Sequence, residues 1–220
     1  MNKIKEKGFF FLLAGVLSGF LMPYVLGAFY PKFNPFRSVI SLLGDVGSPV
    51  QQAFLVWSVV TGIFYLFSLP AVYQEICKTS VKLARIVASL IAAYALGEEI
   101  FSGIFSLDIQ QPTWNFSSWM HNIGSAIGFS GFMVLPYFIY RYYEKKEDKK
   151  WACRYFWLML INFLVIGFYF VSRMITMFQF APFHADGFFQ RLSYFFNYLP
   201  VGIFALNHLK NQKQDDFMLK

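Results

Sequence analysis

The N-terminal stretch MNKIKEKGFFFLLAGVLSGFLMPYVLGAFY, residues 1–30, sets the fold class of the chain. Lys3, Lys5 and Lys7 are followed by 23 residues, 8–30, that carry no charge. A helix needs about 20 apolar residues to cross a hydrocarbon layer about 30 Å thick. A signal peptide also begins with basic residues, but its apolar region is only about 7–15 residues long. We therefore predict that residues 8–30 form an uncleaved transmembrane helix.

Basic clusters and apolar segments alternate in the same way to the C-terminus. Further spans are predicted at residues 52–73, 86–107, 119–140, 155–176 and 192–209. Short loops rich in Lys and Arg stay on the cytoplasmic side of a membrane. The basic clusters lie before the first span and after the second, fourth and sixth. The sequence therefore predicts an all-α, polytopic bundle of six transmembrane helices in the plasma membrane, with both termini cytoplasmic.

The composition agrees with an integral membrane protein. The chain is 57% hydrophobic and only 14% charged, with a mean hydropathy of +0.47, outside the range of ordinary soluble domains. Its net charge of +7 does not point to nucleic acid, because the cations lie beside apolar segments and not among polar residues that read bases. The bilayer, with its anionic headgroups, is the expected partner. No repeat or linker divides residues 1–220, so we predict a single domain.

The two cysteines, Cys77 and Cys153, both lie beside basic clusters that are predicted to be cytoplasmic. Thiols remain reduced in that compartment. We therefore expect neither a disulfide nor a metal site from them.

The third span is the least certain by hydropathy, because Glu98 and Glu99 interrupt it. Without this crossing, the next span would run outward and place the basic residues from Lys145 to Lys150 outside the cell. That arrangement contradicts the charge rule. The two glutamates are therefore predicted to lie inside a transmembrane helix.

A charged side chain at this depth costs a few kcal/mol, and it usually faces the bundle interior or marks a functional route. Adjacent helical positions point about 100° apart, so Glu98 and Glu99 are expected to have different surroundings. Arg173 is the first candidate for an ion pair with a glutamate, and Arg191 is the second. The alternative to a functional role is a buried ion pair that fixes the register of the helices.

The polar residues that lie outside the basic clusters, from Asp45 to Arg191, fall in the outer half of the predicted bundle or in its outer loops. In the first outer loop, Asn34-Pro35 and Ser48-Pro49 frame a short helix at residues 36–43, which we expect to lie along the membrane surface. The candidate functional pocket consists of Ser41, Glu98, Glu99, Asp108, His121, Arg173 and Arg191.

Zinc is one alternative occupant of this region. Asp108, His121 and His184 are predicted at a similar level and are weak candidate ligands. No dense ligand motif is present, so we assign no metal site and the cofactor remains unknown. Ser41 is not framed by a Gly-x-Ser-x-Gly motif, so no catalytic residue is assigned and the question of an enzyme stays open.

Several short motifs occur in order along most of the chain. They are Asn34-Pro35 with Ser38, Ser41, Leu43 and Gly44; Gly103-Ile104-Phe105 with Asp108; His121 at the start of the fourth span; and Gln190-Arg191 before the last. This series resembles the prokaryotic membrane proteins catalogued as domain of unknown function 998.

The resemblance implies a six-helix integral membrane protein and supplies no reaction. It carries over Ser41, Asp108, His121 and Arg191 as residues of the family pattern. The chain departs from that pattern where Leu42 replaces an acidic residue and Ser106 replaces a proline. The loss of that acidic residue weakens an enzymatic assignment.

Three functions remain open. The leading hypothesis is a membrane protein that binds or senses a lipid headgroup or small amphiphile in the outward-facing pocket. The second is a metal-dependent hydrolase, in which Glu98 or Glu99 is the general base beside the candidate zinc ligands. The third is a proton- or ion-coupled transporter that uses the two glutamates and Arg173, although no inverted repeat favours it.

Overall fold

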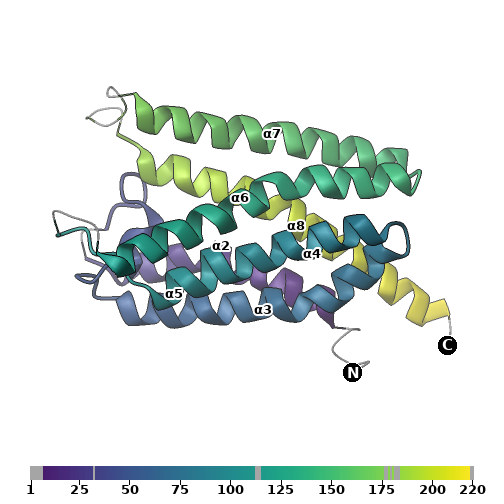
Figure 1. Ribbon diagram of the computed structural model, residues 1–220, viewed down its shortest axis with the longest axis horizontal. Helices are drawn as coiled ribbons and strands as arrows, with labels where there is room; N and C mark the ends of the chain where they lie inside the picture. Colours follow the sequence, from purple (N-terminus) through teal and green to yellow (C-terminus); the bar gives the residue numbers. More distant parts are fainter. Residues whose placement is uncertain are drawn as a thin grey trace.

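The computed structural model describes residues 7–31, 33–111, 115–175, 178, 180 and 184–218, with side chains as far as residue 211. In these residues the fold is all-α and contains no strand. The helices pack side by side along one long axis (Figure 1). The long helices are α2 (Gly8–Ala28), α3 (Gln51–Cys77), α4 (Val81–Ala93), α6 (Phe116–Lys145), α7 (Lys149–Met174) and α8 (Asp186–Met218).

Three shorter elements complete the described chain. A 3-10 helix, η1 (Ile40–Gly44), lies in the loop between α2 and α3. The π-helix η2 (Tyr94–Phe101) and the short α5 (Ser102–Ile104) continue α4 without a break. The segment from Val81 to Ile104 is therefore one long helical rod with a π-helical middle.

Five helical segments in the described chain are long and apolar enough to cross a membrane: Gly8–Ala28, Gln51–Cys77, Val81–Ile104, Phe116–Lys145 and Lys149–Met174. They correspond to the first five predicted spans and include the rod that carries both glutamates. The sixth predicted span lies within α8, which is long enough but not apolar enough to be counted with the others. The crossing by α8 therefore stays a prediction.

The helices extend further at one end of the bundle than the predicted spans. Because the fourth predicted span ends at residue 140 and the fifth begins at residue 155, the sequence predicts a solvated loop at residues 141–150. This prediction was wrong: α6 continues to Lys145 and α7 already begins at Lys149. Two local interactions explain the extension. Arg141 and Glu144 form an ion pair of 2.8 Å one turn apart, and the Asp148 side chain caps α7 by accepting a hydrogen bond from Trp151 N at 3.1 Å.

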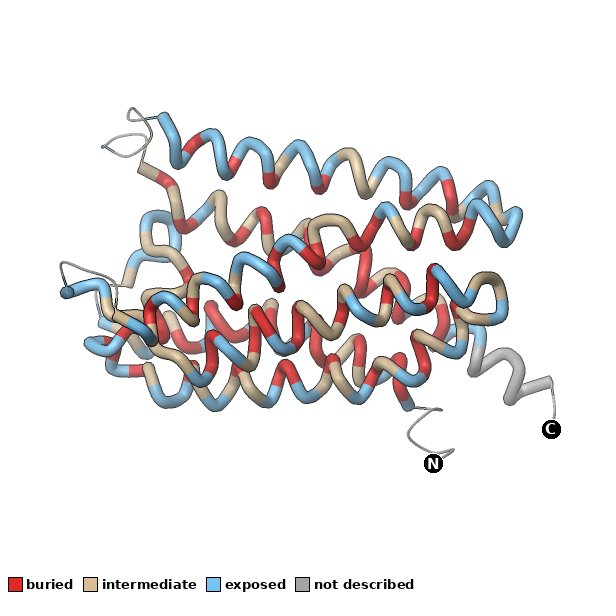
Figure 2. Tube along the Cα trace, in the orientation of Figure 1, coloured by how far each residue is buried: buried red, intermediate tan, exposed pale blue. Residues whose placement is uncertain are grey.

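The turns rich in basic residues gather at a single end of the molecule. The start of α2, the turn between α3 and α4, the turn between α6 and α7, and the last turns of α8 all lie there (Figure 1). Helix α7 lies at the edge of the bundle and is exposed along most of its outer side (Figure 2). The apolar faces of the other helices meet in the interior.

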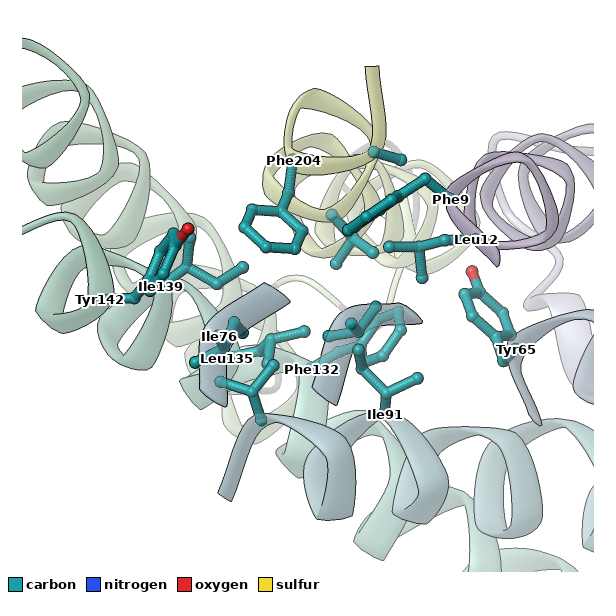
Figure 3. Close-up of a cluster of buried hydrophobic side chains, with 14 of the residues drawn as sticks. Phe9, Leu12, Tyr65, Ile76, Ile91, Phe132, Leu135, Ile139, Tyr142 and Phe204 are labelled. Carbon is teal, nitrogen blue, oxygen red and sulfur yellow. The ribbon is translucent and has the colours of Figure 1, made fainter. Parts of the chain in front are cut away.

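An apolar layer occupies the half of the bundle nearest the basic turns. Phe132 stacks on Tyr94 with ring centroids 3.6 Å apart, and Phe204 packs edge-on against Phe9 at 5.8 Å. Aliphatic side chains fill the spaces between these rings (Figure 3). Leu12, Ile91, Phe132, Leu135 and Phe204 are each no more than 1% exposed. This layer separates two groups of polar side chains, one on each side of it.

Helix α6 packs with almost no space against the π-helix. A Cβ atom added to Gly128 would lie 2.5 Å from Glu98 N, and one added to Gly124 would lie 2.8 Å from Gly97 O. Small residues four apart on a helix allow a neighbouring backbone to approach closely, and Gly124 and Gly128 have this spacing and this close contact. It brings the backbone of the π-helix, and with it Glu98, against α6.

Candidate functional site

Both intramembrane glutamates lie in the π-helix η2. A π-helix is rare and occurs frequently at functional sites. The Ser102 hydroxyl donates hydrogen bonds to the backbone carbonyls of Glu98 and Glu99, which satisfies groups in the irregular turn. The sequence predicted a helix here but gave no signal of its π-helical geometry.

The Glu98 carboxylate is held by hydroxyl groups from two other helices. Ser125 Oγ on α6 donates to Oε2 at 2.6 Å, and the Tyr194 hydroxyl on α8 donates to Oε1. The predicted ion pair with Arg173 or Arg191 was wrong, since no described residue forms an ion pair with either glutamate. The hydroxyl groups of Ser125 and Tyr194 contact the Glu98 carboxylate where an arginine was expected.

Glu99 points into a different environment, a cluster of buried tyrosines. The hydroxyls of Tyr94 and Tyr198 lie 2.7 Å apart, and the Tyr94 hydroxyl also neighbours the Glu99 carboxyl group. Gly19 on α2 leaves room for this cluster, because a Cβ there would lie 2.7 Å from the Tyr198 hydroxyl. Glu99 is only 3% exposed. The prediction that adjacent glutamates have different surroundings is therefore confirmed.

A cavity of about 680 Å³ lies beside Glu98. Its volume falls within the range of about 300–1,000 Å³ that is usual for small-molecule sites. The wall is formed by α6, α7, the start of α8, η1 and the outer part of the long rod. Four residues of the predicted pocket line this cavity, namely Ser41, Glu98, His121 and Arg173.

His121 and Arg173 line the cavity from opposite helices. His121 on α6 is 4% exposed, and its Nδ1 lies 3.0 Å from the Phe105 carbonyl oxygen. Arg173 on α7 donates from NH1 to the Tyr169 hydroxyl at 3.2 Å, and its guanidinium carbon lies 5.9 Å from the centre of the Tyr169 ring. Apolar walls, including Phe129 and Phe170, lie between these polar groups.

The loop between α2 and α3 and the loop between α5 and α6 are joined to each other beside the cavity. Asp45 Oδ1 accepts a hydrogen bond from Ile109 N at 2.9 Å, and Val46 N donates to Leu107 O at 2.9 Å. Asp108, a predicted pocket residue, lies in this junction. Its backbone N–H donates to Ser118 Oγ at 3.1 Å, and its carboxylate accepts from Gln110 N at 3.2 Å. Asp108 therefore stabilises the loop and does not line the cavity.

Arg191 and its neighbour Gln190 hold the loop between α2 and α3 against α8. Arg191 NH1 donates to the carbonyl oxygens of Pro35, Ser38 and Gly187, at 2.8, 2.8 and 2.9 Å. Gln190 Oε1 accepts from Ile40 N at 2.6 Å. Residues 39–42 of the same loop line the large cavity. Arg191 therefore positions a wall of the cavity, whereas its own side chain lines a much smaller one of about 30 Å³ together with Glu99.

The structure does not assemble the candidate zinc ligands. His184 Nε2 lies 3.9 Å from Asp186 Oδ2, at the start of α8, whereas His121 lies against Phe105. Zinc bound by nitrogen and oxygen ligands requires distances of about 2.0–2.2 Å. Within the described ranges, no group of three His, Cys, Asp or Glu side chains could hold a metal ion. The predicted set of Asp108, His121 and His184 is therefore not a preformed site.

Sequence reasoning missed Ser125 and Tyr194, the two residues that bind Glu98. Ser125 follows His121 by four residues, which places both on one face of α6 and could have identified it. No comparable signal marks Tyr194 among the 13 tyrosines of the chain.

A second polar group, at the basic end of the bundle, was also missed. Glu75 at the end of α3 accepts a hydrogen bond from the Tyr142 hydroxyl at 3.0 Å and pairs with Lys78 at 2.6 Å. Lys146 Nζ and His208 Nε2 each lie 3.6 Å from its Oε1. The sequence did offer one signal for this group, because Glu75 is a lone acidic residue beside a basic cluster. We call these five residues the inner polar cluster.

An all-helical bundle with five membrane-length apolar helices and a polar cavity in its interior defines a multi-pass integral membrane protein. A family model described as "Protein of unknown function (DUF998)" matches residues 13–207, and the chain belongs to this family. The resemblance drawn from the short motifs is therefore confirmed. No curated protein and no solved structure matches the chain.

Proposed function

We propose that this protein binds or senses a lipid headgroup or a small amphiphile in the large cavity. The observation that carries the proposal is the cavity of about 680 Å³, in which Glu98, His121 and Arg173 share one space with the apolar side chains of Phe129 and Phe170. A site for an amphiphile needs both kinds of surface in contact with each other. Ligand sites between the helices of bundles have this character.

The polar groups offer complementary chemistry to a headgroup. Glu98 accepts hydrogen bonds, and both of its oxygens are already oriented by Ser125 and Tyr194. Arg173 donates hydrogen bonds and carries a positive charge that favours phosphate or carboxylate. A headgroup with a donor at one end and an anion at the other would satisfy both residues.

The apolar layer supports binding over transport. Along α8, Phe204 lies between Tyr198 of the tyrosine cluster and His208 of the inner polar cluster, and along α6, Phe132 and Leu135 lie between Ser125 and Tyr142. Polar groups on the two sides of the layer are thereby kept apart. The hydrolase hypothesis has less support, because neither Asp108 nor His184 lines the cavity.

The proposed topology completes this picture. Helix α8 is the sixth span, and both termini face the cytoplasm of a cell whose plasma membrane holds the protein. The basic turns then lie inside, as the charge rule requires. The large cavity and η1 lie toward the outer surface, where η1 follows the membrane interface.

Binding can be tested by thermal unfolding of the purified protein with added phospholipids and single-chain amphiphiles. We expect at least one amphiphile to raise the melting temperature of the wild type. Glu98→Gln should weaken that binding by about tenfold, as expected for the loss of one charge-assisted hydrogen bond. Glu144→Gln is the matched control, because Glu144 is an exposed glutamate at the C-terminal end of α6, away from the cavity. Indifference of the wild type to every amphiphile, or equal binding by Glu98→Gln, would contradict the proposal.

A further inference from the structure

Several residues that line the large cavity are also exposed to solvent. On α6 these are Ala126 and Ser130. On α7 they are Phe170 and Met174, with exposed fractions of 51% and 82%. Residues that belong to both surfaces mark an opening. We call the gap bordered by these four residues the lateral opening.

The lateral opening ends where α6 and α7 come together, on the side nearest the turn between them. Helices α6 and α7 meet at the turn of residues 146–148 and spread apart toward the other end of the bundle (Figure 1). Asn162 Nδ2 on α7 donates to the Met133 carbonyl oxygen on α6 at 3.1 Å, and joins the two helices. Further out, the rings of Phe129 and Phe170 are in edge-to-face contact, with centroids 6.3 Å apart. The two helices separate beyond this pair.

The lateral opening and the rest of the cavity lining differ in chemistry. The opening is bordered mainly by apolar side chains. Arg173 lies near the end of α7, and its guanidinium lies back along the helix beside Tyr169. Tyr169 accepts a hydrogen bond from Arg173 NH1 at 3.2 Å, and Glu98 lines the same cavity from the long rod. The lining of the cavity therefore combines apolar surface, a cation, a phenol and a carboxylate.

A phospholipid presents complementary groups. Its acyl chains are apolar, its phosphate is anionic, and in many phospholipids the headgroup ends in an amine or hydroxyl that donates hydrogen bonds. We infer that the ligand of the proposed site is a phospholipid of this class, which enters sideways from the outer leaflet through the lateral opening. Its chains remain in the bilayer against Phe170 and Met174, while its headgroup contacts Arg173 and Glu98. This inference rests on the proposed function and names its ligand and its route.

Side entry can be tested by narrowing the opening without changing the polar groups. The probe is a phosphatidylethanolamine with a photoreactive diazirine in one acyl chain, added to the full-length protein in phosphatidylcholine nanodiscs. Ala126→Trp places a large ring at the opening. Ile127→Trp is the matched control, because Ile127 is 57% exposed on the same helix but does not line the cavity.

We expect cross-links in the wild type on α6 and α7 beside the lateral opening. Ala126→Trp should reduce them by about tenfold, equivalent to about 1.4 kcal/mol of binding, and Ile127→Trp should leave them unchanged. Ser130→Trp, on the next turn of α6, should repeat the effect of Ala126→Trp and protects the test against misfolding of one variant. Glycerophosphoethanolamine, which has the headgroup but no chains, should compete poorly.

The outcomes separate the two proposals. If Glu98→Gln does not reduce cross-linking, the proposed headgroup site is wrong. If Glu98→Gln reduces cross-linking but both tryptophan variants leave it unchanged, the site stands and the lateral route is overturned. Effective competition by glycerophosphoethanolamine would also overturn the route, because a water-borne headgroup would then suffice.

Discussion

Glu98 depends on side chains from two other helices. Its neighbours Ser125 and Tyr194 come from α6 and α8, and each donates one hydrogen bond to a separate carboxylate oxygen. A buried carboxylate that loses a donor is left with an unsatisfied oxygen, which costs more than the net value of a hydrogen bond. The interaction between Tyr194 and Glu98 should therefore be measurable as a coupling energy.

A double-mutant cycle measures this coupling. Tyr194→Phe, Glu98→Gln and the double variant should give a coupling energy of about 1–3 kcal/mol in the free energy of unfolding. The matched control is the exposed pair of Tyr140 and Glu144, in which the hydroxyl donates to Oε1 at 3.1 Å. That pair should show no measurable coupling, because water replaces either partner. Equal couplings for the two pairs would contradict a special role for the buried one.

Arg191 illustrates a residue that the structure places outside the large cavity. The sequence placed it among the pocket residues, yet one of its nitrogens donates to three carbonyl oxygens. It reaches the large cavity through the loop that it holds, whereas its own side chain lines the small cavity beside Glu99. This distinction could not be drawn from the residue type, since an arginine beside the membrane is equally suited to a ligand or to a backbone carbonyl.

At the scale of single helices, the contact of α6 with the π-helix determines where Glu98 lies. Gly128→Ala would place a methyl group 2.5 Å from Glu98 N and should destabilise the protein by about 1–3 kcal/mol, because backbone atoms cannot move aside cheaply. Gly167 on α7 is the control, since nothing lies within 4 Å of an added Cβ there. Gly167→Ala should be neutral or stabilising by up to about 1 kcal/mol, through helix propensity. Unfolding in detergent measures both, and similar effects at the two positions would contradict the packing.

The inner polar cluster joins the ends of three helices. Glu75 on α3 contacts Tyr142 on α6 and His208 on α8. Glu75→Gln keeps the shape of the side chain and removes its charge, so it should destabilise the protein by about 1–3 kcal/mol. It should leave amphiphile binding unchanged, because the apolar layer separates it from the cavity. If the Glu75→Gln protein is fully folded and still binds the amphiphile more weakly, the two polar regions are coupled.

At the scale of the whole molecule, the native cysteines provide a test of topology. Cys153 is exposed near the start of α7, among the basic residues. A membrane-impermeant maleimide should label it only after the cells are permeabilised. In a variant lacking both native cysteines, Gln110→Cys in the second outer loop should be labelled in intact cells. Labelling of Cys153 from outside would reverse the proposed orientation.

The crossing by α8 needs a separate measurement, because this helix is less apolar than the other five. A reporter that is active only in the cytoplasm, fused to the C-terminus, should be active if α8 crosses the membrane. A periplasmic or extracellular reporter at the same position should be inactive. The opposite pattern would leave five spans and place the C-terminus outside.

The sequence by itself determined the membrane class, the helical fold and the approximate position of each long helix. These properties depend on the hydrophobicity of local segments, and the bilayer imposes the length of each one. The basic clusters likewise predicted which turns gather at one end. The prediction failed at residues 141–150, because short-range ion pairs and a helix cap extend the helices beyond the apolar spans.

Only the tertiary structure decided which polar residues meet. Four predicted residues share the large cavity, whereas Glu99, Asp108 and Arg191 lie elsewhere. That outcome depends on how far each helix is rotated and shifted along its axis, and these are set by packing such as the contact of Gly128 with Glu98. Adjacent glutamates of identical chemistry therefore acquire different partners, and the physical reason is the geometry between helices, which no single segment encodes.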